Sequence, residues 1–170
     1  SITLSNFKYK KIIDSKKNVL FIDDYHRWNH SKGIIVDWTI GVESNKPIQN
    51  SRVNYLLGAK YTALRKEFYD VKNKVHSKVI KNVMITFGGG DIRNMTPKIM
   101  LYIKEYYPNI NLNVIIGKSY TNTKEIERIA SQNTNLIYFP DATKIKNTMM
   151  KSDIAVASGG VTLYELARVG

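Results

Sequence analysis

From Val79 onward, short runs of apolar residues alternate with segments in which apolar residues recur at helical spacing. The first run, residues 83–87, leads directly into three consecutive glycines. Residues 96–107 follow, with Ile99 and Ile103 on one helix face. Because parallel sheets are built from strands that alternate with helices, this pattern predicts an α/β fold with a Rossmann-like parallel sheet flanked by helices.

The alternation continues to the end of the sequence and predicts six further elements. Strands are expected at residues 112–117, 135–139 and 154–157, and helices at residues 124–131, 145–151 and 161–169. Pro108 and Asn109 end the first helix, and Pro140 and Asp141 turn the chain after the third strand. The last helix still runs at the final residue, so we expect a domain that is truncated at its C-terminus.

The first half of the sequence has a weaker periodicity. Strands are expected at residues 18–23, 34–36 and 55–57, with polar connecting segments at residues 45–54 and 70–78. We therefore expect three regions: residues 1–70 as the end of an N-terminal domain with an interdomain region, residues 71–78 as a linker, and residues 79–170 as the Rossmann-like domain.

Two passages from a strand through glycines into a helix are the candidate ligand-binding features. The first consists of Gly88, Gly89, Gly90 and Asp91, and the next helix is expected to be capped by Thr96. Glycines directly after a parallel strand let backbone N–H groups approach a phosphate closely. The spacing matches neither a Walker loop nor the dinucleotide fingerprint, so a plain tight turn is the alternative interpretation.

The second passage follows residues 154–157 and opens the last helix. Its candidate residues are Ser158, Gly159, Gly160, Val161, Thr162 and Glu165. Thr162 and the exposed N–H groups at the start of this helix suit a diphosphate. Glu165 lies on the same helix face, where a carboxylate can accept hydrogen bonds from ribose hydroxyls. The simpler alternative is a helix cap followed by a solvent-exposed glutamate.

The formal net charge of +12 raises the question of a nucleic-acid partner. The lysines are scattered along the chain rather than gathered in one stripe, and the sequence has no aromatic and basic RNA-binding pattern. We therefore expect no nucleic-acid partner. The positive charge instead favours attraction of a small anion such as a sugar nucleotide.

Other classes of protein find little support in the sequence. No apolar run approaches the roughly 18 residues that a membrane span requires. The first residues lack the apolar core and the small-residue cleavage pattern of a signal peptide. The sequence has no cysteine, which excludes disulfides and thiolate metal sites. We expect a cytoplasmic protein without a membrane span, metal or cofactor.

Three histidines and one pair of carboxylates are the remaining candidates for acid–base chemistry. His26, His30 and His76 are residues of the type that acts as a general base. Asp23 and Asp24 are adjacent at the end of an expected strand. Because neighbouring side chains on a strand point to opposite faces, we expect no working acid–base dyad from this pair. The sequence therefore leaves the catalytic residues unassigned.

The two glycine passages resemble those in the C-terminal domain of GT-B fold sugar-nucleotide enzymes. Residues 85–91 and 153–165 carry this resemblance. The closer similarity is to the UDP-sugar hydrolase of pseudaminic acid biosynthesis and its spore-coat polysaccharide relatives, and the more distant one is to the peptidoglycan UDP-N-acetylglucosamine transferase. Residues 21–24 and the string Leu-Gly-x-x-Tyr-x-x-Leu-Arg-x-x-Phe at residues 57–68 are similar to the interdomain region of that hydrolase.

The resemblance implies that UDP binds in a cleft between two Rossmann-like domains. It implies that the first glycine loop faces the phosphates, that the backbone around Phe139 and Pro140 contacts uracil, that residues 160–162 bind the diphosphate, and that Glu165 holds the ribose. In the hydrolase, water attacks the sugar–nucleotide linkage and releases UDP and a free amino-sugar. A histidine in a glycine-rich loop of the N-terminal domain assists, and this sequence has no matching segment, so we expect the chain by itself to be inactive.

Two other functions stay open beside hydrolysis. A GT-B glycosyltransferase with a UDP-sugar donor would have the same nucleotide site but would need an acceptor site in the missing N-terminal domain. A non-catalytic module that binds a sugar nucleotide would explain the absence of the histidine loop. The partner expected in every case is a UDP-sugar, whose sugar the sequence does not identify.

Overall fold

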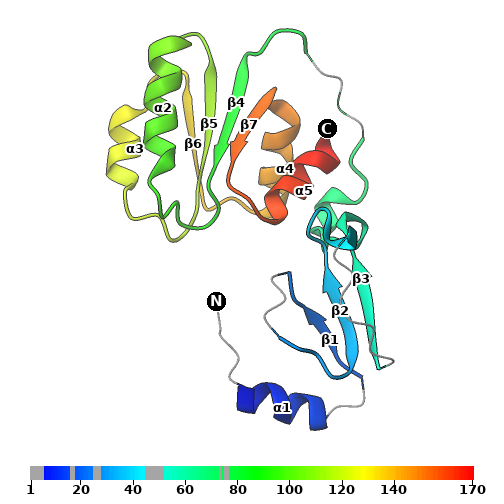
Figure 1. The fold of residues 1–170 in the computed structure, drawn as a ribbon. Helices are drawn as coiled ribbons and strands as arrows, with labels where there is room; N and C mark the ends of the chain where they lie inside the picture. The colour runs from blue at the N-terminus through cyan, green and yellow to red at the C-terminus, as the bar shows by residue number, and fades with distance from the viewer. Residues whose placement is uncertain (1–5, 16–17, 25–27, 45–51, 73, 75–76) are drawn as a thin grey trace. The chain divides into compact units, whose positions relative to one another are not determined.

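The computed structural model describes residues 6–15, 18–24, 28–44, 52–72, 74 and 77–170. The chain divides into two compact units, Ser1–Ala63 and Leu64–Gly170. Each unit has its own sheet (Figure 1), and every strand pairing described in either sheet is parallel. The structure therefore confirms the α/β fold with Rossmann-like parallel sheets that the hydrophobic pattern predicts.

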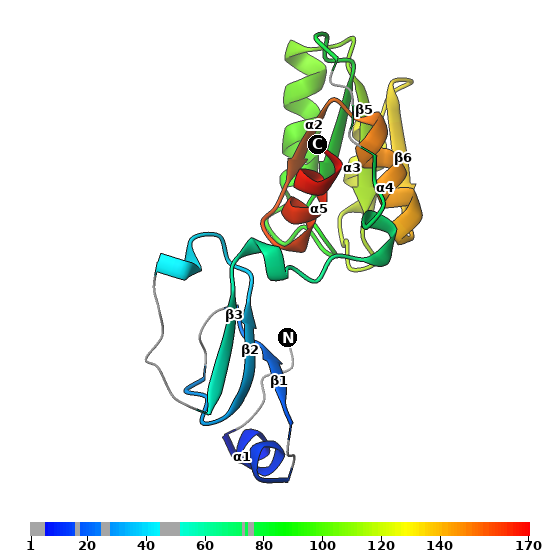
Figure 2. The ribbon, with the colours of Figure 1, turned by 90° about the vertical axis from the view of Figure 1, so that its right-hand side faces the viewer.

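The first unit is built on a three-stranded sheet in the order β1-β2-β3. Figure 2 shows the three strands side by side. The sheet comprises β1 (Leu20–Ile22), β2 (Gly33–Asp37) and β3 (Val53–Leu57), with short 3-10 turns η1 (Val42–Ser44) and η2 (Ala59–Tyr61). All three strands were expected, although β3 already begins at Val53, inside the segment expected to be a polar connector. Residues 45–51 of that segment lie outside the described residues.

A helix that the sequence did not predict precedes this sheet. This helix, α1, spans Asn6–Ser15. Among the side chains described in it, only that of Ile13 is buried, with 6% of its surface exposed. Because the described part of α1 has a single buried apolar side chain, it leaves almost no periodic signal, and sequence patterns miss it.

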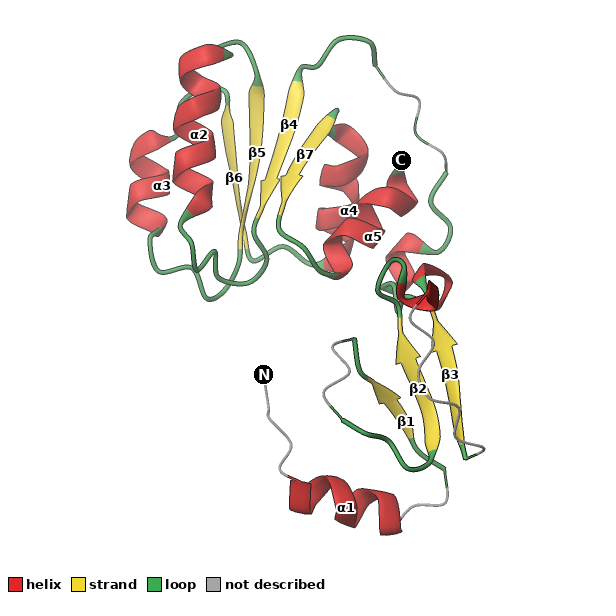
Figure 3. Cartoon of the chain, viewed as in Figure 1, coloured by secondary structure: helices red, strands yellow, loops and turns green. Residues whose placement is uncertain are grey.

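The second unit contains a four-stranded sheet in the order β6-β5-β4-β7. Figure 3 shows α2 and α3 on one side of this sheet and α4 and α5 on the other. Its strands are β4 (Asn82–Thr86), β5 (Asn111–Ile116), β6 (Thr134–Tyr138) and β7 (Ile154–Ala157), and its helices are α2 (Met95–Tyr106), α3 (Thr123–Ile129), α4 (Ala142–Lys151) and α5 (Val161–Val169). All of these elements were predicted, and their bounds differ from the expected ones by only a few residues.

Alternate residues of the strands form the two layers of the core. Val83, Ile85 and Val114 pack with Met100 of α2 and Ile126 of α3 on one face of the sheet. The other face is packed by α4, α5 and the turn η3 (Lys66–Phe68), whose contributions include Met84, Ile115, Ile137, Met149, Val169 and Phe68. Strands covered on both faces are apolar at successive positions, which is why they appear as continuous apolar runs in the sequence.

The segment before β4 belongs to the second unit. Phe68 is fully buried in the core layer beside α4 and α5. The guanidinium of Arg168 in α5 donates hydrogen bonds to the carbonyls of Tyr69 and Val71, at 2.6 and 2.9 Å. The second unit thus starts at Leu64, whereas the sequence suggests a boundary at residue 70. The expected linker at residues 71–78, part of which lies outside the described residues, stays a prediction.

None of the helices in the described ranges combines the length and apolar character needed to cross a membrane.

We expect Phe68→Ala to lower the free energy of unfolding of the second unit by about 3–5 kcal/mol, because it removes a buried aromatic ring and leaves a cavity. Chemical denaturation monitored by circular dichroism measures this change. The matched control is Tyr69→Ala, since 61% of the Tyr69 surface is exposed, and we expect it to change stability by less than about 0.5 kcal/mol. Equal effects of the two substitutions would contradict the assignment of this segment to the second core.

Candidate functional site

The four strands of the second sheet end at one edge, and the predicted ligand-binding residues gather there. β4 leads into Gly88, β5 into Gly117, β6 into Phe139 and β7 into Ser158. Because the strands are parallel, the loops after their carboxyl ends share this edge, which is where open α/β sheets bind ligands. The structure therefore brings together two glycine passages that are far apart in the sequence.

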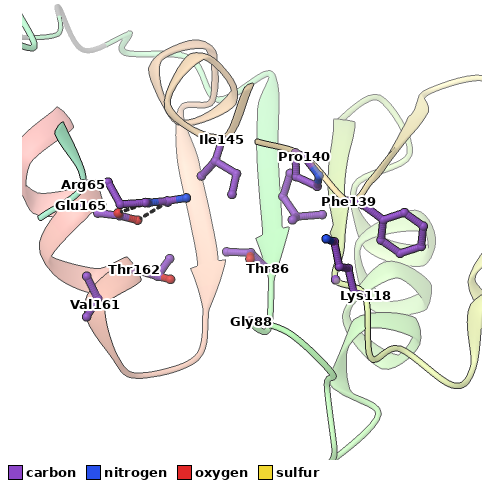
Figure 4. Close-up of a pocket in the computed structure, with 12 residues that line it drawn as sticks. Arg65, Thr86, Gly88, Lys118, Phe139, Pro140, Ile145, Val161, Thr162 and Glu165 are labelled. Carbon is purple, nitrogen blue, oxygen red and sulfur yellow. Dashed lines mark hydrogen bonds and ion pairs between the residues drawn. The ribbon is translucent and has the colours of Figure 1, made fainter. Parts of the chain in front are cut away.

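The first of two hollows at this edge has a volume of about 410 Å³. Figure 4 shows the residues that line it. Those predicted from the sequence are Gly88, Phe139, Pro140, Val161, Thr162 and Glu165. Those that the sequence analysis did not select are Arg65, Thr86, Ile115, Gly117, Lys118 and Ile145. The volume lies within the range of small-molecule sites.

The second hollow has a volume of about 820 Å³ and contains the other part of the predicted site. Its predicted residues are Gly89, Gly90, Asp91, Ser158 and Gly159, and it also includes Phe87, Ile92, Arg93, Met95 and Ser119. Gly88 lines the first hollow and Gly89 lines the second, so the first glycine loop separates the two. Gly160 lines neither hollow and is the N-cap residue of α5.

Glu165 is buried and paired, which excludes the alternative of a solvent-exposed glutamate. Only 2% of its surface is exposed. Nε of Arg65 donates to Oε1 of Glu165 at 2.6 Å, and Nη2 donates to Oε2 at 2.7 Å (Figure 4). The hydrogen bond to Glu165 raises the pKa of the Arg65 guanidinium. This bidentate pair stabilises the carboxylate in a buried position and fixes its orientation. Each carboxylate oxygen retains further acceptor capacity.

The loop after β5 packs tightly against the first glycine loop. The backbone N–H of Ser119 donates to the carbonyl of Gly89 at 2.9 Å. A Cβ atom on Gly117 would lie 2.5 Å from the carbonyl oxygen of Gly89 and 2.6 Å from that of Gly88. No side chain fits at this distance from backbone, so Gly117 lets the two loops meet. Gly88 itself has a φ of 73°, in the left-handed region that favours glycine.

Phe139 has an unusual backbone conformation for a residue with a side chain. Its φ is 48°, and 55% of its surface is exposed. Its N–H donates to the carbonyl of Ile116 at 2.9 Å, which holds this conformation in place. The left-handed conformation costs about 1–2 kcal/mol for a non-glycine residue, and such conformations cluster at ligand sites. Strain at a residue predicted to contact a base is a reason to keep it among the site residues.

The N-cap residue of α2 is Asn94, and the side chain that caps the helix is that of Asp91, which corrects the expectation that Thr96 is the cap. The Asp91 carboxylate accepts hydrogen bonds from the N–H groups of Met95 at 2.9 Å and Thr96 at 2.7 Å. Thr96 is fully buried, and its hydroxyl lies 3.2 Å from that of Tyr120. A sequence pattern places a cap only to within a few residues, because several polar residues near a helix start have the right chemistry. Asp91 therefore stabilises the helix that follows the glycine loop.

Cationic side chains outnumber free carboxylates around the hollows. Within the described part of the chain, neither Lys118 nor Arg93 has an ion-pair partner. Arg65 neutralises Glu165, and Asp91 is occupied by N–H donors. The local charge balance favours an anionic ligand, in agreement with the chain's net charge of +12.

Asp23 and His30, two of the acid–base candidates in the first unit, are buried and contact each other. His30 is only 6% exposed, with Nε2 at 3.0 Å from Oδ2 of Asp23 and Nδ1 at 3.1 Å from the hydroxyl of Tyr9. Oδ2 of Asp23 also accepts a hydrogen bond from the N–H of Trp28 at 3.3 Å. Both ring nitrogens of His30 are therefore occupied in a buried cluster, which makes His30 a structural residue of this unit.

The two other candidate bases, His26 and His76, lie outside the described residues. Among the residues that the structure describes, no group of three or more His, Cys, Asp or Glu side chains is arranged to hold a metal ion.

We expect Gly117→Ala to destabilise the second unit by about 1–3 kcal/mol, because the new methyl group would displace the backbone of the first glycine loop. Gly159→Ala is the matched control, since a Cβ atom there meets nothing within 4 Å and its backbone needs no left-handed conformation. Its effect should stay within about 0.5 kcal/mol. Urea titrations of the two variants measure the difference, and a neutral Gly117→Ala would show that the loops do not pack as described.

Comparison with known proteins finds similarity to an archaeal protein and does not show a family. No protein-family model matches the sequence. The chain is 27% identical over 172 residues to the uncharacterized protein MJ1062 of Methanocaldococcus jannaschii. The match covers 95% of this chain but 36% of the archaeal protein, so the chain spans little more than a third of the length of this relative. This relative does not indicate a function, so the geometry of the hollows is the main guide to what the protein binds.

Proposed function

We propose that the second unit binds the UDP part of a UDP-sugar. One observation carries the proposal: the first hollow combines a glycine loop, the start of α5 and a buried carboxylate held by Arg65. Nucleoside diphosphates present the matching groups, namely two phosphates, a ribose with two hydroxyls and an aromatic base.

Electrostatics and backbone geometry support a diphosphate between the two glycine passages. The first N–H groups of a helix have no helical acceptors, and α5 begins at Val161 directly after Gly160. Gly160 has a φ of 115°, a conformation that favours glycine. The helix N-terminus carries partial positive charge, and the hydroxyl of Thr162 adds a donor inside the hollow.

The buried carboxylate supports a ribose beside α5. Glu165 lies one turn after the start of the helix, within reach of the sugar that joins the phosphates to the base. Its orientation is fixed by Arg65, so hydrogen bonds to ribose hydroxyls would not require the carboxylate to reorganise. The base would then extend toward Phe139 and Pro140, on the far side of the hollow.

The reaction that best suits this site is hydrolysis of a UDP-linked amino-sugar to UDP and free sugar, in the biosynthesis of a surface polysaccharide or nonulosonic acid. Its support is the resemblance of both glycine passages and of the string at residues 57–68 to the UDP-sugar hydrolase family. The buried environment of His30 supports a base supplied from elsewhere in such an enzyme. Use of a nucleotide-activated sugar and the lack of cysteine suit a cytoplasmic location.

Calorimetric titration with UDP, 2′-deoxy-UDP, ADP and GDP tests the nucleotide site. We expect the protein to prefer UDP to ADP and GDP, and to bind UDP roughly ten- to a hundredfold more tightly than 2′-deoxy-UDP, because a hydrogen bond to a charged group contributes about 1.5–3 kcal/mol. Glu165→Gln removes the charge but keeps one acceptor oxygen, so the preference for UDP over 2′-deoxy-UDP should be reduced. Glu105→Gln, which changes an exposed carboxylate of α2, is the matched control and should bind as the unaltered protein does.

Absence of binding to every nucleotide would contradict the proposed function. Binding of UDP and 2′-deoxy-UDP with equal affinity would contradict the role of Glu165 but not the presence of a nucleotide site. Product analysis after incubation with a UDP-amino-sugar separates the reactions, since hydrolysis yields UDP and free sugar without an acceptor, whereas glycosyl transfer requires one.

A further inference from the structure

The end of the first hollow opposite Glu165 is apolar except for one charged side chain. Phe139 and Pro140 supply apolar surface there (Figure 4). Lys118 follows Gly117 after β5 and has no hydrogen-bond or ion-pair partner in the described part of the chain. Figure 4 shows its side chain extending between Thr86 and Phe139. This end of the hollow therefore suits a flat ring that packs on apolar side chains and accepts one hydrogen bond from the ammonium group of Lys118.

Arg65, the other cationic residue of this hollow, is not available to donate hydrogen bonds to a ligand at this end. Arg65 is engaged by both oxygens of Glu165. Figure 4 shows the Arg65–Glu165 pair and Thr162 on the other side of β4 from Lys118. A nucleotide whose ribose lies at Glu165 and whose phosphates lie at the start of α5 would therefore bring its base, not its phosphates, toward Lys118.

A lysine at this position distinguishes bases by the groups at their edges. The ammonium group has three donors and no acceptor. Uracil, like thymine, carries a carbonyl acceptor at position 4, where cytosine carries an amino donor. An ammonium group therefore forms a hydrogen bond with uracil at this position and meets an unfavourable donor in cytosine.

We propose that Lys118 is a specificity-determining residue that donates a hydrogen bond to the O4 carbonyl of uracil and so selects UDP over CDP. This inference rests on the proposed function, because it requires a nucleoside diphosphate in the first hollow. Lys118 would then be the side chain that selects the base, at an end of the hollow that is otherwise lined by apolar side chains and backbone.

The test is a comparison of the dissociation constants of UDP and CDP for the unaltered protein and for Lys118→Met. Methionine keeps most of the length of the side chain and removes its charge and donors. We expect the affinity for UDP to fall about tenfold, the effect of one charge-assisted hydrogen bond, and that for CDP to change less than about twofold. Lys124→Met, which alters an exposed lysine of α3, should change neither affinity.

Uridine and cytidine provide a second measurement without phosphates, in which the same loss of preference for uracil is expected. Equal weakening of UDP and CDP by Lys118→Met, with no effect on the two nucleosides, would show that Lys118 interacts with phosphate and would overturn the inference. An unchanged ratio of UDP to CDP affinity would overturn it as well. Failure of the unaltered protein to bind either nucleotide would refute the proposed function, and with it this inference.

Discussion

Parallel hydrogen bonding of β4 with both of its neighbours is the constraint on which the second unit depends. Ile85 of β4 lies opposite Val114 of β5 on one side and Val156 of β7 on the other. Because both pairings are parallel, the loops that leave these strands emerge at the same edge of the sheet. The two glycine passages become neighbours for this reason, and the hollows lie between the loops that the pairing aligns.

The ion pair between Arg65 and Glu165 both stabilises the fold of the second unit and forms part of the candidate site. A buried carboxylate without a partner costs several kcal/mol, so Glu165 can remain inside the hollow only because Arg65 neutralises it. Arg65 comes from the segment that Phe68 anchors in the core, so packing of that segment also positions the charge. With this pair internally balanced, Lys118 and Arg93 leave the hollows cationic, and the net charge of the chain extends the same attraction for anions to longer range.

The pattern of apolar residues was sufficient to predict the α/β class and every strand and α-helix described in the second unit. Its strands are buried on both faces and its helices on one, so the two kinds of element leave different periods in the sequence. The glycine passages and Glu165 could also be recognised, because glycines after a strand and a carboxylate on the first turns of a helix are local features. The pattern failed for α1, because little apolar surface is buried in its described part. It also failed for the cap of α2, because several neighbouring polar residues suit that role.

What the sequence by itself determined was therefore local: the class of fold, the order of its elements and the chemical type of its loops. Only the tertiary structure decided that Arg65 pairs with Glu165, that Gly117 is required by the carbonyls of Gly88 and Gly89, and that Lys118 extends into the first hollow. These relations join residues from different strands and helices. They depend on strand order and register, which are set by the packing of the whole sheet and leave no trace in the spacing of neighbouring residues.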